Sequence, residues 1–114
     1  MAAGSASRQQ LDVISIGRCS VDLYGQQIGS RLEDVASFAK SVGGCPSNIA
    51  IGTARLGLKS GLITRVGDEQ MGRYVKEQMA REGVSLDGIA SVQSRLTSLV
   101  LLSVDNDKTF PLIF

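Results

Sequence analysis

The sequence predicts an α/β fold with a parallel sheet at its core. Strand-like apolar runs at residues 11–17 and 61–66 alternate with helical patterns at 46–56 and between Asp68 and Gly83. These segments end at or next to glycines, which suit the turns between strands and helices. Alternating strands and helices are typical of a parallel sheet with right-handed crossovers.

The first run, Leu11–Gly17, has the composition of a central strand in such a sheet. Because ligands bind beyond the carboxyl ends of these strands, residues 18–22 are expected at the rim of a candidate site. Arg18 and Asp22 are the charged members of this segment. From the residues alone, Asp22 suits a turn or a cap equally well, and Arg18 a solvated surface charge.

The chain between residues 23 and 42 has a less regular pattern. Residues 23–28 and 35–42 are predicted as two strands, joined by a polar turn at 29–34. The apolar positions do not alternate perfectly, so the register is open. A plain β-meander at the edge of the domain is one interpretation.

A glycine-rich turn then leads into the first helix. The pair Gly43–Gly44 frees the backbone for a positive φ and for close approach to a ligand. Pro46 suits the first helical turn, where Ser47 or Asn48 can cap or line the unpaired N–H groups. Gly57 is a natural C-terminal stop. The segment predicts a polar, concave site at a helix N-terminus.

A second helix follows the strand at 61–66. Asp68 is its expected N-cap and Gly83 its end. Its apolar face consists of residues at helical spacing: Met71, Tyr74, Val75 and Met79.

The last third of the chain predicts a hairpin. Residues 97–104 form a strongly apolar strand, 105–108 a polar turn, and 109–114 a returning strand. Because the sequence stops on an apolar strand, we expect a truncated domain whose exposed strands favour aggregation.

The composition restricts the kinds of partner and site that this chain is expected to have. The formal net charge is +1 without a basic run, so neither nucleic acid nor an anionic membrane surface is indicated. There is no histidine, and Cys19 and Cys45 lack the spacing of a zinc site. Both cysteines are expected at one rim of the sheet, as free thiols in a reducing cytoplasm. Residues 1–10 are small and polar and predict a disordered tail.

The order of Gly43–Gly44, Asn48, a small residue, Gly57 and Gly67 resembles the N-terminal signature of the ribokinase-type (PfkB) carbohydrate kinases. The resemblance implies a ribokinase-like fold, with residues 11–114 as the N-terminal portion of the kinase domain. It also implies that residues 23–42 form a small β-lid over the sugar. A homodimer formed through the lid of the full-length protein is a further expectation.

The resemblance assigns part of a sugar site. Asp22 and Asn48 would bind sugar hydroxyls, and Gly43 and Gly44 would allow backbone contact. The string from Gly17 to Tyr24 looks most like the 5-dehydro-2-deoxygluconokinases of inositol catabolism. In such an enzyme Arg18 would pair with the carboxylate of a sugar acid.

The implied reaction is ATP-dependent phosphorylation of a primary hydroxyl on a small sugar or sugar acid. ATP and Mg²⁺ are the family's cofactors, but this chain has neither the family's Gly-Ala-Gly-Asp motif nor a Walker A sequence. We therefore expect no ATP site, no catalytic base and no turnover from residues 1–114 alone. Another sugar or nucleoside kinase, such as a fructokinase or ribokinase, and a noncatalytic fragment remain alternatives.

Overall fold

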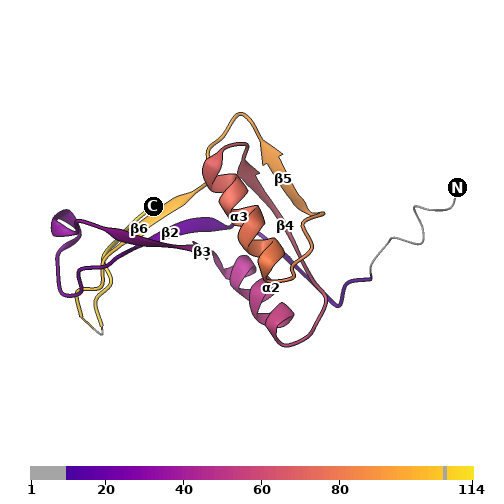
Figure 1. Cartoon of the computed structure of the whole chain (residues 1–114), viewed down its shortest axis with the longest axis horizontal. Helices are drawn as coiled ribbons and strands as arrows, with labels where there is room; N and C mark the ends of the chain where they lie inside the picture. The colour runs from indigo at the N-terminus through magenta and orange to yellow at the C-terminus, as the bar shows by residue number, and fades with distance from the viewer. Residues whose placement is uncertain (1–9, 107) are drawn as a thin grey trace, which may run out of the picture.

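The computed structural model describes residues 10–106 and 108–114. A three-stranded parallel sheet has the order β1 (Val13–Ile16), β4 (Ser60–Gly67), β5 (Ile89–Val92). Two helices, α2 (Cys45–Arg55) and α3 (Gln70–Arg81), lie side by side across one face of it (Figure 1). This is the predicted parallel core.

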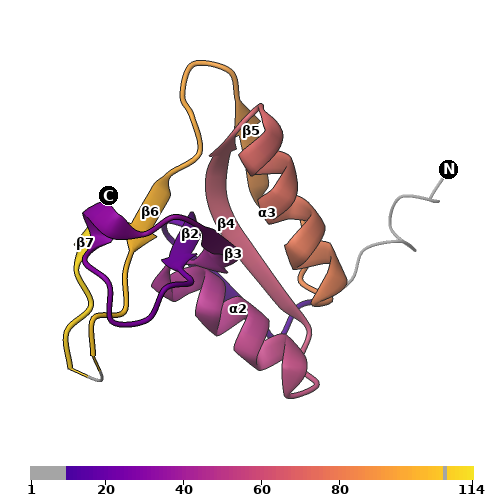
Figure 2. The same ribbon diagram turned by 60° about the vertical axis from the view of Figure 1, so that its left-hand side comes forward.

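A second, mixed sheet projects to one side of the helices (Figures 1 and 2). Its order is β3 (Phe38–Gly43), β2 (Ser20–Gly25), β6 (Leu99–Leu102), β7 (Leu112–Ile113). Strand β2 runs antiparallel to β3 and parallel to β6, and β7 returns antiparallel to β6. A single 3₁₀ turn, η1 (Leu32–Asp34), lies between β2 and β3.

The hydrophobic core lies between the helices and the parallel sheet. Leu62 and Val66 of β4 pack with Val75 and Met79 of α3, and each of these side chains is at most 2% exposed. Val21 of β2 joins the same cluster and ties the mixed sheet to the core. Burying such aliphatic side chains stabilises the fold by about 1.5–3 kcal/mol each.

Strand β2 begins and ends three residues earlier than the sequence predicted. Pairing decides its limits, because Ser20 lies opposite Gly43 and Val21 opposite Leu99. As a result, Asp22 lies inside a strand of the mixed sheet and not in the turn or cap that its sequence position also suited. Strand β3 likewise runs over Phe38–Gly43, whereas residues 35–42 were predicted.

The expected cap of α3 is wrong by one residue. Glu69, not Asp68, is the N-cap, and its carboxylate accepts hydrogen bonds of 3.0 Å from the backbone N–H groups of Met71 and Gly72. A longer side chain reaches back to the first helical turn as effectively as the usual short cap residues do. Strand β5 was not predicted, and β6 is shorter than the predicted strand at 97–104.

The C-terminal hairpin is present as predicted, although residue 107 in its turn lies outside the described residues. Except for Gln10, the predicted tail at residues 1–10 also lies outside them. Among the described residues, no helix has the length and apolar character needed to cross a membrane.

Candidate functional site

The Asp22 carboxylate lies directly against the backbone of Gly43. Ser20 donates a hydrogen bond of 2.7 Å from its hydroxyl to Oδ1 of Asp22, which orients the carboxylate. A side chain at Gly43 would overlap this group, since the added Cβ would lie within 2.5 Å of Oδ1 and closer to the other two carboxylate atoms. The first glycine of the pair is therefore required by the position of Asp22.

Gly44 is the N-cap of α2 and has a φ of 97°, a conformation that favours glycine. A Cβ there would lie 2.7 Å from the carbonyl oxygen of Arg18 and 3.1 Å from Cα of Cys19. The turn before α2 is thus packed against the connection between β1 and β2. The Asp22 carboxylate and the Arg18 backbone therefore both lie against the glycine turn.

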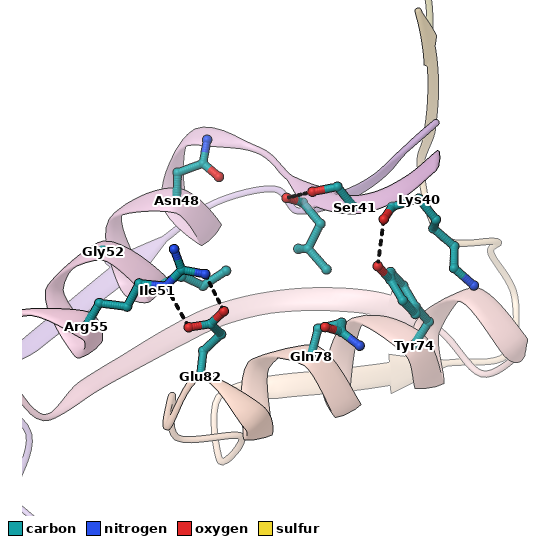
Figure 3. Close-up of a pocket in the computed structure, with 10 residues that line it drawn as sticks. Lys40, Ser41, Asn48, Ile51, Gly52, Arg55, Tyr74, Gln78 and Glu82 are labelled. Atoms are coloured by element: carbon teal, nitrogen blue, oxygen red, sulfur yellow. Dashed lines mark hydrogen bonds and ion pairs between the residues drawn. The ribbon is translucent and has the colours of Figure 1, made fainter. Parts of the chain in front are cut away.

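Asn48 lies in the first turn of α2, where its backbone N–H donates to the carbonyl of Gly44 at 3.0 Å. Its side chain is exposed and borders a hollow of about 440 Å³ between β3, α2 and α3 (Figure 3). The polar residues around this hollow come from all three elements: Lys40, Ser41, Asn48, Arg55, Tyr74, Gln78 and Glu82.

An ion pair closes one end of the hollow and a tyrosine the other. Arg55 donates to both carboxylate oxygens of Glu82, at 2.8 and 2.5 Å, and lowers the pKa of that carboxyl. The Tyr74 hydroxyl donates to the carbonyl of Lys40 at 3.2 Å, and the Lys40 ammonium lies 4.1 Å from the Tyr74 ring centroid. Figure 3 shows the Asn48 amide pointing away from the ion pair.

The Asp22 carboxylate does not line the hollow, although its strand partner Ser41 does. Asp22 is paired with Ser41, so their side chains share one face. Val42, the next residue along β3, points to the other face and packs against the core cluster with Tyr74. Asn48 is the predicted site residue that borders the hollow, whereas Asp22 is absent from its walls.

Arg18 extends from the connection between β1 and β2 toward the end of the chain. Its guanidinium carbon lies 5.1 Å from the centroid of the Phe114 ring, within the range of a cation–π contact. This neighbour could not be predicted from the sequence, because the two residues are far apart in the chain and meet only through the pairing of β2, β6 and β7.

The two cysteines are neighbours with different environments. Cys19 is buried, and burial raises the pKa of its thiol even though Thr64 donates to Sγ at 3.7 Å. Cys45 is exposed and follows Gly44, whose backbone is packed against Cys19. Both are free thiols.

The glycine-rich turn does not fit the phosphates of a nucleotide. The side-chain space at both glycines is filled by the chain's own atoms, and the nearest charged group is a carboxylate, which repels phosphate. Within the part of the chain that the structure describes, no three Asp, Glu, Cys or His side chains gather as metal ligands. The glycine-rich turn therefore differs from a phosphate-binding loop.

The fold is that of a family of carbohydrate kinases. The family model for the pfkB family of carbohydrate kinases matches residues 10–114, and the chain belongs to that family. The 5-dehydro-2-deoxygluconokinase of Lacticaseibacillus casei is 51% identical over 76 residues, which are 67% of this chain and 23% of that enzyme. The enzyme of the same name from Geobacillus thermodenitrificans is 41% identical over 87 residues, 76% of this chain and 26% of that enzyme. The chain thus spans about a quarter of these relatives.

Solved structures give the same ribokinase-like fold. A PfkB protein from Polaromonas is 34% identical with a TM-score of 0.84, over 91% of this chain and 35% of that one. A sugar kinase from Pyrococcus horikoshii is 35% identical with a TM-score of 0.81, over 89% of this chain and 35% of that one. The predicted fold class, with its parallel core and small second sheet, is confirmed.

Proposed function

We propose that the protein to which this chain belongs phosphorylates a primary hydroxyl of a small sugar acid with ATP, and that 5-dehydro-2-deoxygluconate is its substrate. The chain would supply part of the sugar site. The observation that carries this assignment is the carboxylate of Asp22, oriented by Ser20 over the glycine turn at the start of α2. The names of the similar curated enzymes support the choice of substrate.

Each proposed residue has a chemical role that suits a polyhydroxylated ligand. A carboxylate accepts hydrogen bonds from hydroxyls and an amide can both donate and accept, so Asp22 and Asn48 are suitable hydroxyl ligands. A sugar is uncharged at these positions and is not repelled by Asp22, in contrast to a phosphate. The space beside Gly43 and Gly44 is filled by the Asp22 carboxylate and the Arg18 carbonyl, so these glycines would serve the site by bringing both groups to the N-terminus of α2 rather than by direct ligand contact.

Arg18 would bind the carboxylate that distinguishes a sugar acid from a sugar. Burying that charge without a partner would be costly. A guanidinium can donate two parallel hydrogen bonds to the two carboxylate oxygens. Arg18 is exposed and its backbone lies next to the glycine turn, so its side chain is available to a ligand.

The nucleotide and the catalytic base would come from outside the described residues. ATP provides the phosphoryl group in this class of reaction, and Mg²⁺ neutralises its developing charge. The P. horikoshii sugar kinase has been solved in complex with ATP. Residues of this chain would bind and orient the acceptor, which accounts for a large part of catalysis in phosphoryl transfer.

A fructokinase is the second candidate. The fructokinase of Halothermothrix orenii is 32% identical with a TM-score of 0.81, over 90% of this chain and 37% of that one. Such an enzyme would need Asp22 and Asn48 but no cation at position 18.

The two candidates differ in what Arg18 does, and substitutions in a full-length kinase containing residues 1–114 distinguish them. Arg18→Met should lower kcat/KM for 5-dehydro-2-deoxygluconate roughly ten- to a hundredfold, as expected for the loss of a charge-assisted hydrogen bond. The same substitution should lower kcat/KM for fructose far less. Asn48→Ala should lower kcat/KM for both substrates. Equal losses for both substrates in Arg18→Met would contradict the sugar-acid assignment and leave the kinase assignment standing.

A further inference from the structure

One face of the mixed sheet carries Asp22, Val100 and Phe114 in a row. Asp22 of β2 is paired with Val100 of β6, and paired residues of neighbouring strands project to the same face. Leu101 is paired with Ile113 of β7, so the same antiparallel register places Phe114 opposite Val100. The carboxylate and the aromatic ring therefore lie on one face, two strands or about 10 Å apart.

Arg18 reaches this face from the β1–β2 connection. Its guanidinium carbon is 5.1 Å from the Phe114 ring centroid, so the charge of Arg18 lies over the β7 end of the row. Its backbone is held at the other end, because the Arg18 carbonyl lies against Gly44. The side chain thus reaches from the glycine turn to the Phe114 ring.

A guanidinium held at an aromatic ring can still bind an anion. Its attraction to the ring is directed at the face of the π system, whereas its five N–H donors lie in its own plane. The contact restricts the rotamers of a long and flexible side chain, and so reduces the entropy lost when the fork engages both oxygens of a carboxylate.

Building on the function proposed above, we propose that Phe114 is a positioning residue for substrate selection. It holds the Arg18 guanidinium at the β7 end of the face, where the fork binds the carboxylate of the sugar acid. The hydroxyls at the other end of the same ligand bind Asp22. The buried, apolar Val100 lies between the two ends and offers no polar group to compete for the ligand.

This arrangement also explains how one face can bind an acid beside a carboxylate. Two negative groups in contact would repel each other strongly, and the repulsion falls with distance. A separation of two strands keeps the substrate carboxylate away from Asp22 and next to the single cation that the row provides.

The test uses a full-length kinase containing residues 1–114, with 5-dehydro-2-deoxygluconate as the probe. Phe114→Leu keeps an apolar side chain but removes the ring, and it should raise KM roughly two- to fivefold with kcat unchanged, as expected for an exposed cation–π contact. Phe114→Trp keeps a ring and should retain the original KM. Phe110→Leu is the matched control, because Phe110 is an exposed phenylalanine in the same hairpin arm and outside the row.

A double variant shows whether the ring acts through the arginine. Phe114→Leu should add nothing to the KM of Arg18→Met, because the guanidinium that it positions is already gone. Additive losses, or a Phe114→Trp variant as impaired as Phe114→Leu, would overturn the role of Phe114. If Arg18→Met has a normal KM for the acid, the substrate class proposed above fails as well. Loss of phosphorylation in Asp22→Asn would then still support a sugar kinase.

Discussion

Replacing Gly43 with alanine tests the candidate site with the smallest possible change. The new methyl group would overlap the Asp22 carboxylate, whose Oδ1 would be only 2.5 Å away. Gly43 does not have a positive φ, so alanine is compatible with its backbone. The carboxylate can rotate away at less cost than the paired β3 strand can move, and we expect Asp22 to leave its bond with Ser20.

The size of the effect follows from the hydrogen bonds that a displaced carboxylate loses. A hydrogen bond to a charged group contributes about 1.5–3 kcal/mol. At 1.4 kcal/mol per decade, Gly43→Ala should lower kcat/KM by roughly ten- to a hundredfold for acidic and neutral sugars alike. The loss should match that of Asp22→Ala, since both variants remove the same oriented group.

The assay is steady-state kinetics of a full-length kinase containing residues 1–114, together with urea unfolding. Gly52→Ala is the control, because Gly52 lies in α2 with nothing within 4 Å of an added Cβ. Alanine there should raise the free energy of unfolding by about 0.5–1 kcal/mol, so this variant controls for the effect of an added methyl group on folding. A folded Gly43→Ala variant with kcat/KM within twofold of the original would refute the role given to Asp22.

Three further predictions concern stability and the thiols. Gly72→Ala should destabilise by about 1–3 kcal/mol in urea unfolding despite the better helix propensity of alanine, because its methyl group would overlap the backbone carbonyl at the end of β4; an unchanged midpoint would contradict this. Hydrogen bonds from Thr97 lower the pKa of Glu69 below its usual 4.5, so the ionised form stabilises the fold above pH 4.5 and this contribution is lost as the pH falls through the lowered pKa. Melting temperatures should accordingly fall less steeply below pH 4.5 in Glu69→Gln than in the original protein, and parallel curves would argue against it. Iodoacetamide at pH 8 should label the exposed Cys45 in the native state and the buried Cys19 only after unfolding, as mass spectrometry of the peptides would show.

Local chemistry explains why the region around α2 could be predicted. A glycine at the N-cap, Pro46 in the first turn and Gly57 with a φ of 94° act on the backbone of their own neighbours. The helix bounds therefore follow from a dozen consecutive residues. The next strand, β4, is an apolar run that can be predicted from its own residues, without knowing which strands pair with it.

The remaining features depend on residues far apart in the sequence. The limits of β2 are set by its pairing with β3 and β6, and the short β5 lacks a strong pattern of its own. Glu69 caps α3 while also accepting hydrogen bonds from the N–H and hydroxyl groups of Thr97, in the segment before β6. The contacts with Thr97 favour Glu69 over Asp68 as the N-cap, and they cannot be predicted from the residues next to the helix.

In the candidate site, too, the location of the glycines could be predicted from the sequence, but the reason for them could not. The sequence indicated that Gly43 and Gly44 lie at a binding site, on the general ground that glycines let a ligand approach the backbone. In the structure, the side-chain space at Gly43 is filled by the Asp22 carboxylate and that at Gly44 by the Arg18 carbonyl. Both glycines thus bring two chemically useful residues of the β1–β2 segment up to the start of α2. Because the glycine pair makes room for a negatively charged carboxylate, this turn favours a ligand with hydroxyl groups over one with a phosphate. In this respect it differs from the glycine-rich loops that bind nucleotides, which present N–H groups to a phosphate.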